Sequence, residues 1–229
     1  MDWVMQVIVS MERHNRFKRI IGLLAVGILL VTAFSFSSEN RASGLGVTKT
    51  IYLTFDDGPH PIFTPLLLSL LDENGAKATF FPIGSRVEER WENDDLQDLL
   101  NRGHAIGNHS WSHRDLSKEN ENGILFQLNQ SSVITEKMTG FSPSCFRAPF
   151  GQKNQSVLNV ASGLGMKHVD WSVDPQEWSD TSIDKAMDHI VERLEDGAIV
   201  LLHDRRFLAL PIVREIFKTF PNSEWSYEA

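Results

Sequence analysis

The chain has 229 residues, of which 41% are hydrophobic, enough for one packed domain and a short additional segment. Its formal net charge of -8 argues against nucleic acid as a partner, because proteins that bind a phosphate backbone usually carry a basic patch. The single cysteine, Cys145, excludes an intrachain disulfide.

A basic cluster at residues 13–19 begins the informative part of the chain. It precedes an apolar run at 20–34, and a polar stretch follows at 35–46. This order is typical of an export signal. The run is shorter than the roughly 20 residues that a membrane span needs, and small residues at 33–37 offer cleavage sites, so we favour a cleaved signal peptide over an uncleaved anchor.

In both interpretations everything after Gly46 is exported and the positive residues stay on the cytoplasmic side. We therefore expect a signal or anchor segment with its linker at 1–46 and one folded domain at 47–229. The domain is expected to be extracellular or held at the cell surface, with membrane contact only through an uncleaved N-terminal segment. The start stays open between Met1 and Met11, because the charged region before the run is unusually long.

From Thr50 onward, short β-forming runs alternate with longer helical patterns, which is typical of an α/β domain with a largely parallel sheet. The strands are expected at 50–55, 78–82, 105–108, 144–147, 167–171 and 198–203. The helices are expected at 62–73, 92–102, 123–139, 155–163, 182–195 and 211–220. Polar clusters follow most of these strands, and reactive groups in such folds gather at the carboxyl ends of strands. Five separate segments are therefore expected to converge on one face.

Two adjacent carboxylates, Asp56 and Asp57, leave the first strand and enter a Gly-Pro turn. Neighbouring side chains of an extended chain point to opposite sides. The two carboxylates can therefore share a site only if the turn bends both into one pocket. One of them could then bind a cation while the other takes a proton. By itself, such a turn is more often ordinary solvated turn chemistry.

Two histidines, His109 and His113, stand four residues apart. On a helical turn these positions share a face, which would let both rings reach one metal ion. Two histidines and one carboxylate form a common catalytic ligand set with open positions for water and substrate, so the pair and Asp57 support each other. Surface histidines without a ligand are the competing interpretation.

Three further segments carry polar and aromatic residues: Phe-Arg-Ala-Pro-Phe-Gly at 146–151, Asp-Trp-Ser-Val-Asp-Pro-Gln-Glu-Trp at 170–178, and Val-Leu-Leu-His-Asp at 200–204. With these, the sequence resembles the polysaccharide deacetylases of the NodB-homology family over about residues 49–220. The five motifs occur in the family's order, and their combination makes the resemblance specific.

The resemblance implies a distorted (β/α) barrel with fewer than eight units, and a hydrolase that attacks the N-acetyl groups of amino-sugar polymers. It also implies roles for individual residues. Asp56 is the general base, His203 the general acid, Arg147 orients Asp56, Asp174 partners His203, the Phe150 N–H helps to stabilise the oxyanion, and Asp57, His109 and His113 bind zinc or a similar divalent ion. Trp178 is a weaker candidate for stacking on a sugar ring.

This assignment agrees with the chemistry of amide hydrolysis. The reaction needs a nucleophile at neutral pH, and a metal ion supplies one by activating water. A backbone donor at the oxyanion typically contributes about 3 to 4 kcal/mol in the transition state. The amine leaves only after protonation, and a carboxylate beside a histidine keeps that histidine charged for the task.

The chain departs from the family pattern at three places. Phe150 stands where an aromatic residue with a hydroxyl is usual, and Glu177 replaces the aspartate before Trp178. The C-terminal segment 221–229 is polar, so the strand that closes the barrel is expected to be short or absent.

Two alternatives to a deacetylase of peptidoglycan or chitin-type oligomers stay open. One is a hydrolase of acetyl esters or small amides, since the same metal-water chemistry would serve these substrates. The other is a cell-surface carbohydrate-binding protein that keeps the fold and lacks turnover. Every position with an implied catalytic role holds a competent residue, which weighs against this second alternative.

Overall fold

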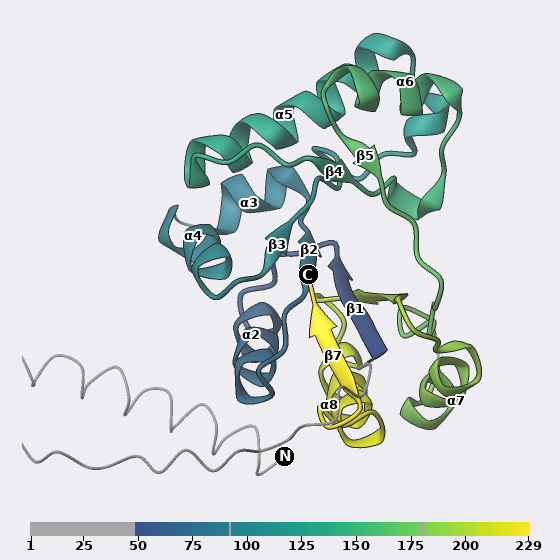
Figure 1. Ribbon diagram of the computed structural model, residues 1–229. Coiled ribbons are helices and arrows are strands. Elements are labelled where there is room, and N and C mark those ends of the chain that lie inside the picture. The colour runs from purple at the N-terminus through teal and green to yellow at the C-terminus, as the bar shows by residue number, and fades with distance from the viewer. Residues whose placement is uncertain (1–48, 92, 180) are drawn as a thin grey trace, which may run out of the picture. The chain divides into compact units, whose positions relative to one another are not determined.

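Parallel strands form the centre of the computed structural model, which describes residues 49–91, 93–179 and 181–229 (Figure 1). One edge of β1 pairs with β6, and its other edge pairs with β7 along the first half and with β2 along the second half. β3 extends the sheet beyond β2. The strands of this sheet are β1 (Lys49–Asp56), β2 (Thr79–Phe81), β3 (Ala105–Ile106), β6 (Ala198–His203) and β7 (Trp225–Glu228).

A second, two-stranded sheet pairs β4 (Cys145–Phe146) with β5 (Lys167–His168), again in parallel. Two isolated bridges connect it with the larger sheet, one from Asn108 to Phe146 and one from Val173 to Val200. The strands therefore follow one another around a distorted barrel whose ladders are not continuous within the described residues. The expected α/β fold with parallel strands is confirmed.

Helices surround these strands (Figure 1). The long helix α5 packs against α3, α4 and α6, while α8 packs against α2 and α7. Their bounds are α2 (Phe63–Glu73), α3 (Gly84–Arg90), α4 (Asn93–Asn101), α5 (Glu121–Thr139), α6 (Gln155–Gly163), α7 (Ile183–Arg193) and α8 (Ala209–Thr219), with short 3-10 helices at Leu116–Lys118 and Pro149–Gly151.

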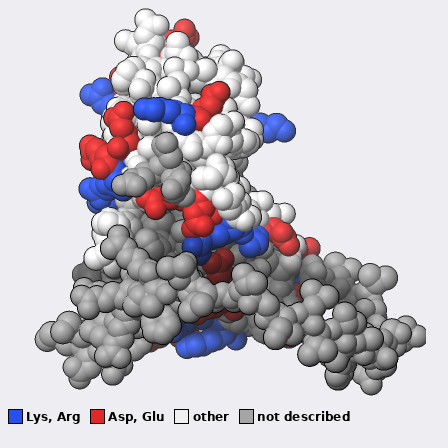
Figure 2. Space-filling model, turned by 90° about the vertical axis from the view of Figure 1, so that its left-hand side faces the viewer, with Lys and Arg blue, Asp and Glu red and all other residues white. Residues whose placement is uncertain are grey.

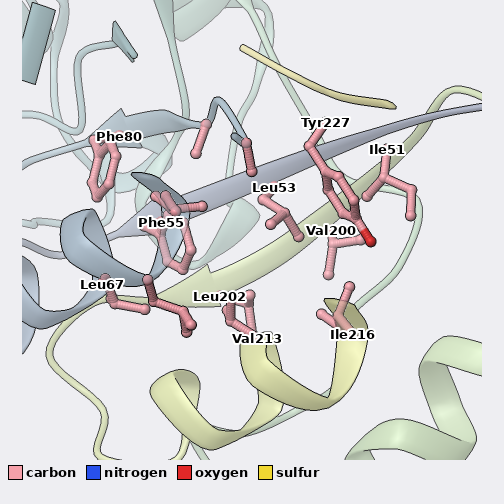
Figure 3. Close-up of a cluster of buried hydrophobic side chains, with 14 of the residues drawn as sticks. Ile51, Leu53, Phe55, Leu67, Phe80, Val200, Leu202, Val213, Ile216 and Tyr227 are labelled. Atoms are coloured by element: carbon pink, nitrogen blue, oxygen red, sulfur yellow. The ribbon is translucent and has the colours of Figure 1, made fainter. Parts of the chain in front are cut away.

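Alternation along β1 divides its side chains between the hydrophobic core and the site. Ile51, Leu53 and Phe55 are fully buried and meet apolar side chains of β6, α2 and α8 (Figure 3). Burying each such side chain contributes about 1.5 to 3 kcal/mol. Thr54 and Asp56 lie on the opposite face of the strand, because side chains alternate with a period of two. The core therefore orients Asp56 toward the carboxyl-end face.

Helix α3 and strand β7 are not among the helices and strands that were placed from the sequence. Helix α3 contains four charged residues and buries only Gly84 and Val87, so its apolar periodicity is too short to reveal it. Strand β7 lies in the polar C-terminal segment, but its alternate residues Trp225 and Tyr227 are buried against the main core. The C-terminal strand was expected to be short or absent, and it is present with four residues.

The expected export segment at 13–34 lies outside the described residues. Of the helices in the described ranges, none combines the length and the apolar character that crossing a membrane requires.

Candidate active site

The strand register brings Asp56 and His203 together. They are Cα partners at the carboxyl ends of β1 and β6. Asp56 is 3% exposed, and Arg147, which is completely buried, donates from Nη1 to Asp56 Oδ1 at 2.8 Å and to Thr54 Oγ1 at 2.7 Å. Thr54 and Asp56 can share this donor because they lie two residues apart on one face of the strand.

Arg147 is itself held from several sides. Its Nε donates to the Val169 carbonyl and its Nη2 to the Asp170 carbonyl, while the guanidinium lies over the Phe81 and Trp171 rings. A buried guanidinium with its donors satisfied loses little further freedom, so it holds its partner rigidly. This geometry suits the expected role of Arg147 in orienting Asp56.

The turn after β1 redirects Asp57. Its backbone is left-handed, with φ 73°, which a non-glycine residue adopts at a cost of order 1 kcal/mol or more. In an extended chain Asp57 would point away from Asp56. Here its Oδ1 lies 3.1 Å from His113 Nε2 and 3.6 Å from His109 Nε2. The condition that both carboxylates enter one pocket is therefore met by this backbone conformation.

His109 and His113 lie on a loop, not on the helical turn that their spacing suggested. Two left-handed residues, Ser110 and His113, bend the loop, and hydrogen bonds from the Ser110 N–H to Asn108 Oδ1 and from the His113 N–H to Ser110 Oγ hold it. The rings still meet, with centroids 5.0 Å apart. The two histidines converge because left-handed residues and side-chain hydrogen bonds bend the loop, and the four-residue spacing alone does not predict this bend.

Asp57, His109 and His113 have the geometry of a cation site, since one ligand atom from each lies within 4.8 Å of the others. His109 Nδ1 lies 2.8 Å from the Arg147 carbonyl, a contact that places the proton on Nδ1 and leaves Nε2 free as a ligand. Asp57 Oδ1 is buried and, among the described residues, has no hydrogen-bond partner. These three residues therefore fit a divalent metal ion.

The ionisation of these side chains also suits a metal. Burial acts to raise the pKa of Asp57, but the neighbouring imidazoles of His109, His113 and His203 hold it well below its usual range. Burial, with the charge of His109, lowers the pKa of His113 to about 4, although Asp57 and Asp56 oppose this. An ionised carboxylate and a neutral imidazole are the forms that bind metal ions.

Glu177, and not Asp174, is the partner of His203. Its Oε1 lies 2.8 Å from His203 Nδ1 and accepts the His203 N–H at 2.6 Å, and the carboxylate is 3% exposed. Burial acts to lower the pKa of His203, but the hydrogen bond and charge of Glu177, with Asp56 and Asp57, raise it overall. A raised pKa keeps the imidazolium to higher pH, as a general acid requires.

Asp174 has a different part in this loop, and the expectation that it pairs with His203 is corrected. Its Oδ1 accepts the Gln176 N–H at 2.8 Å and the Trp178 Nε1–H at 3.3 Å, which builds a turn in which Gln176 has φ 58°. This turn uses Asp174 Oδ1 as a hydrogen-bond acceptor and positions Glu177 beside His203. The sequence places Asp174 and Glu177 in the same loop, so both were candidates for the partner of His203. The Asp174-Pro175 pair, which is typical of a turn, was the signal that Asp174 would be used within the loop.

Phe150 lies at a further left-handed position, with φ 59° and ψ 10°. Its ring is 63% exposed and meets the His113 ring edge-on, with centroids 4.5 Å apart. All five non-glycine residues with positive φ in the described part belong to the loops around this site: Asp57, Ser110, His113, Phe150 and Gln176. Such strained conformations cluster at functional sites, which supports a functional role for these loops.

One cavity of about 300 Å³ joins these groups. Eight of the nine residues predicted from the sequence line it: Asp56, Asp57, His109, His113, Phe150, Asp174, Trp178 and His203. Arg147 lies behind Asp56. Trp171 and Arg206 also line the cavity and were not predicted. Trp171 packs on Gly151, where an added Cβ would lie 2.8 Å from the indole, a contact with no local sequence signal.

Comparisons with known proteins agree with this site. The sequence profile of the family described as "Polysaccharide deacetylase" matches residues 46–169. A chitooligosaccharide deacetylase of Azorhizobium caulinodans is 38% identical over 157 residues, which are 68% of this chain and 74% of that protein. A peptidoglycan-N-acetylglucosamine deacetylase of Bacillus cereus is 38% identical over 159 residues, 68% of this chain and 73% of that protein.

Among solved structures, the peptidoglycan deacetylase PdaC of Bacillus subtilis superimposes with a TM-score of 0.73 at 34% identity, covering 80% of this chain and 88% of that one. The profile match spans more than half of the chain, and the aligned relatives cover two thirds of it. The chain therefore belongs to the polysaccharide deacetylase family and is an enzyme of that family.

Proposed function

We propose that this enzyme is a metal-dependent hydrolase that removes N-acetyl groups from polysaccharide containing N-acetylglucosamine, such as peptidoglycan or chitin-type oligomers. One observation carries the proposal: a carboxylate held by a buried arginine, a histidine held by a buried glutamate and a three-residue metal-ligand set line the same cavity. These groups are a base, an acid and a cation site, which are the parts that amide hydrolysis needs.

The protein groups divide the proton transfers between them. Asp56, fixed by Arg147, would take the proton of the attacking water. His203, charged through its contact with Glu177, would give a proton to the departing amine. The main-chain N–H at Phe150 is the proposed donor to the oxyanion, and the left-handed backbone there orients it differently from an extended chain.

Asp57, His109 and His113 would hold the metal ion. A set of two imidazoles and one carboxylate that leaves further positions open suits zinc, which we propose as the resident ion. When bound, the ion would activate water and polarise the acetyl carbonyl.

An amino-sugar polymer is the substrate that fits best. Exposed aromatic rings at Phe150 and Trp178, with Trp171, line the cavity and provide apolar faces on which sugar rings could stack. The curated relatives are named for chitooligosaccharide and for peptidoglycan, which supports this substrate class for the present enzyme. Acetyl-ester or small-amide hydrolysis would use the same groups and is the alternative that a substrate comparison must test.

We further propose that the enzyme is exported and acts outside the cytoplasm. The support is the order of basic residues at 13–19, apolar residues at 20–34 and polar residues at 35–46. Cell fractionation tests this, and a mature protein found soluble in the cytoplasm and starting at Met1 or Met11 would contradict it.

The deciding experiment measures acetate release by the purified protein, loaded with zinc or treated with a chelator, on peptidoglycan, chitooligosaccharides and acetylated xylan. We expect release from one or both amino-sugar polymers, lost on chelation and restored by added metal. Release from xylan alone would move the substrate class to acetyl esters. Binding of the polymers without release from any of them would favour the carbohydrate-binding alternative.

A further inference from the structure

Four arginines lie on two segments that adjoin the Asp57 turn. Arg86 and Arg90 are four residues apart on α3 and share a face of that helix. Arg86 Nη1 donates to the Asp57 carbonyl at 2.6 Å, so this face of α3 lies against the turn. Arg205 and Arg206 lie just after β6, separated from its last residue by Asp204, and Arg206 lines the cavity.

Tight packing brings the two arginine-bearing segments together. The Asp204 carboxylate lies against the main chain of Gly58, where an added Cβ would be 2.2 Å from Asp204 Oδ2. Arg205 therefore starts beside the same turn that Arg86 contacts. The charges of Arg205 and Arg90 accordingly add to burial, the larger cause, in lowering the pKa of His60, which follows this turn.

These cations have no carboxylate partner. Within the described residues Arg86, Arg90, Arg205 and Arg206 form no ion pair, and the buried Nε of Arg205 has no hydrogen-bond acceptor. The nearby carboxylates are used otherwise, since Asp57 faces the imidazoles and Asp204 is buried, with a pKa that burial raises to about 7. Glu88 and Glu89, although on α3, form no ion pair with the four arginines among these residues.

Four other arginines in the described ranges form ion pairs. Arg102, Arg114, Arg147 and Arg193 each have a carboxylate partner. On the described part of the face in Figure 2, positive and negative side chains are interspersed, as paired charges produce. In a chain with a formal net charge of -8, four neighbouring arginines that form no ion pair with any described residue are unusual. Like charges held together repel, and a bound anion would relieve that repulsion.

We propose that Arg86, Arg90, Arg205 and the cavity-lining Arg206 form an anion subsite, which takes a carboxylate of the polysaccharide whose N-acetyl sugar enters the cavity. Guanidinium groups bind carboxylates through paired, charge-assisted hydrogen bonds, and the four side chains here have no competing carboxylate partner among the described residues. The inference rests on the proposed function and deepens it: the preferred substrate is an acidic amino-sugar polymer, and a neutral one is used less well.

The test uses two chitooligosaccharides of equal length, one carrying carboxymethyl ether groups and the other the uncharged carbamoylmethyl groups of nearly the same shape. Acetate release gives kcat/KM for each, at low and at high salt. We expect the wild-type protein to favour the carboxymethyl substrate by roughly 10-fold, the effect of one hydrogen bond to a charged group, and to lose most of this preference at high salt.

The variants Arg90→Gln and Arg90→Gln/Arg205→Gln should lower the ratio of the two kcat/KM values toward one. Arg90 is exposed, so the single variant should fold normally even if the half-buried Arg205 proves structural. Arg193→Gln on α7, which removes an exposed arginine paired with Glu192, is the matched control and should keep the ratio.

Equal kcat/KM values for both substrates in the wild-type protein would overturn the subsite, as would an equal loss of preference in the Arg193→Gln control. Calorimetry of oligosaccharide binding separates this inference from the proposed function. If no acetate is released, yet the wild-type protein binds the carboxymethyl form more tightly and the double variant does not, the subsite stands and the hydrolase proposal fails. Equal binding of both forms would overturn the subsite itself.

Discussion

The site has two halves that the fold builds in different ways. Asp56 and His203 end two paired strands, so the ladder between β1 and β6 sets their relative position. Asp57 and His113 lie on loops and Phe150 lies within the short 3-10 segment Pro149–Gly151, each with a left-handed backbone. The proposed proton-transfer groups are thus held by regular structure, while the proposed metal and oxyanion groups depend on backbone conformations that ordinary residues avoid. Substitutions in the two halves should therefore fail in different ways.

The largest expected effect is on rate, from the strand half. Asp56→Asn should lower acetate release by about 100- to 10,000-fold, because the amide keeps its size and loses the basic lone pair. Metal content and oligosaccharide affinity should stay largely intact, since Asp56 is assigned to proton transfer. Metal analysis and kinetics check this together. If Asp56→Asn lost the metal and Asp57→Asn kept it, the two roles would have to be exchanged.

The loop half should instead lose metal. His109→Ala and His113→Ala each remove a proposed ligand, so metal affinity should fall by more than the roughly 10- to 100-fold that loss of an outer-shell partner costs. Metal analysis after dialysis is the measurement, with His189→Ala on α7 as the control. Stoichiometric metal in both variants would remove the assigned site.

Within the strand half, the contact between Glu177 and His203 can be tested by its effect on pH dependence. Because Glu177 raises the pKa of His203, Glu177→Gln should let that pKa fall, and the imidazolium would be lost at lower pH. The alkaline limb of the kcat/KM profile should then move to lower pH. The loss of kcat/KM near neutral pH should be smaller than the roughly 100- to 10,000-fold that a general acid contributes.

Asp174→Asn is the matched control for this pH measurement. It should leave the alkaline limb in place, whatever it does to the rate, because Asp174 accepts hydrogen bonds within its own loop. The reverse pattern, with the limb moved by Asp174→Asn and not by Glu177→Gln, would restore Asp174 as the partner of His203.

The smallest expected effect tests the left-handed loops themselves. Gln176 is exposed and has φ 58°, a conformation that glycine adopts freely and a β-branched residue resists. Gln176→Val should lower stability by about 1 to 2 kcal/mol, or roughly 2 to 4 °C in Tm for each kcal/mol. Gln176→Gly should melt close to the wild-type protein. Equal melting of the two variants would show that backbone strain at this loop is unimportant.

The sequence by itself determined most of the secondary structure and the residues of the cavity. The expected strand at 198–203 and helix at 155–163 coincide with β6 and α6, because apolar periodicity and turn residues act over short distances. Parallel strands also place their carboxyl ends at one edge, so motifs that follow strands could be expected to meet. The export segment stays a prediction.

Only the tertiary structure decided which side chains touch. Asp56 and Arg147 lie 91 positions apart, and Glu177 and His203 lie 26 apart, so neither contact has a local pattern. Glu177 and not Asp174 contacts His203, because Asp174 accepts hydrogen bonds within its own turn. The meeting of the two histidines on a loop follows from left-handed residues that spacing does not reveal. Periodicity reports on neighbours along the chain, whereas these contacts depend on how distant segments pack together.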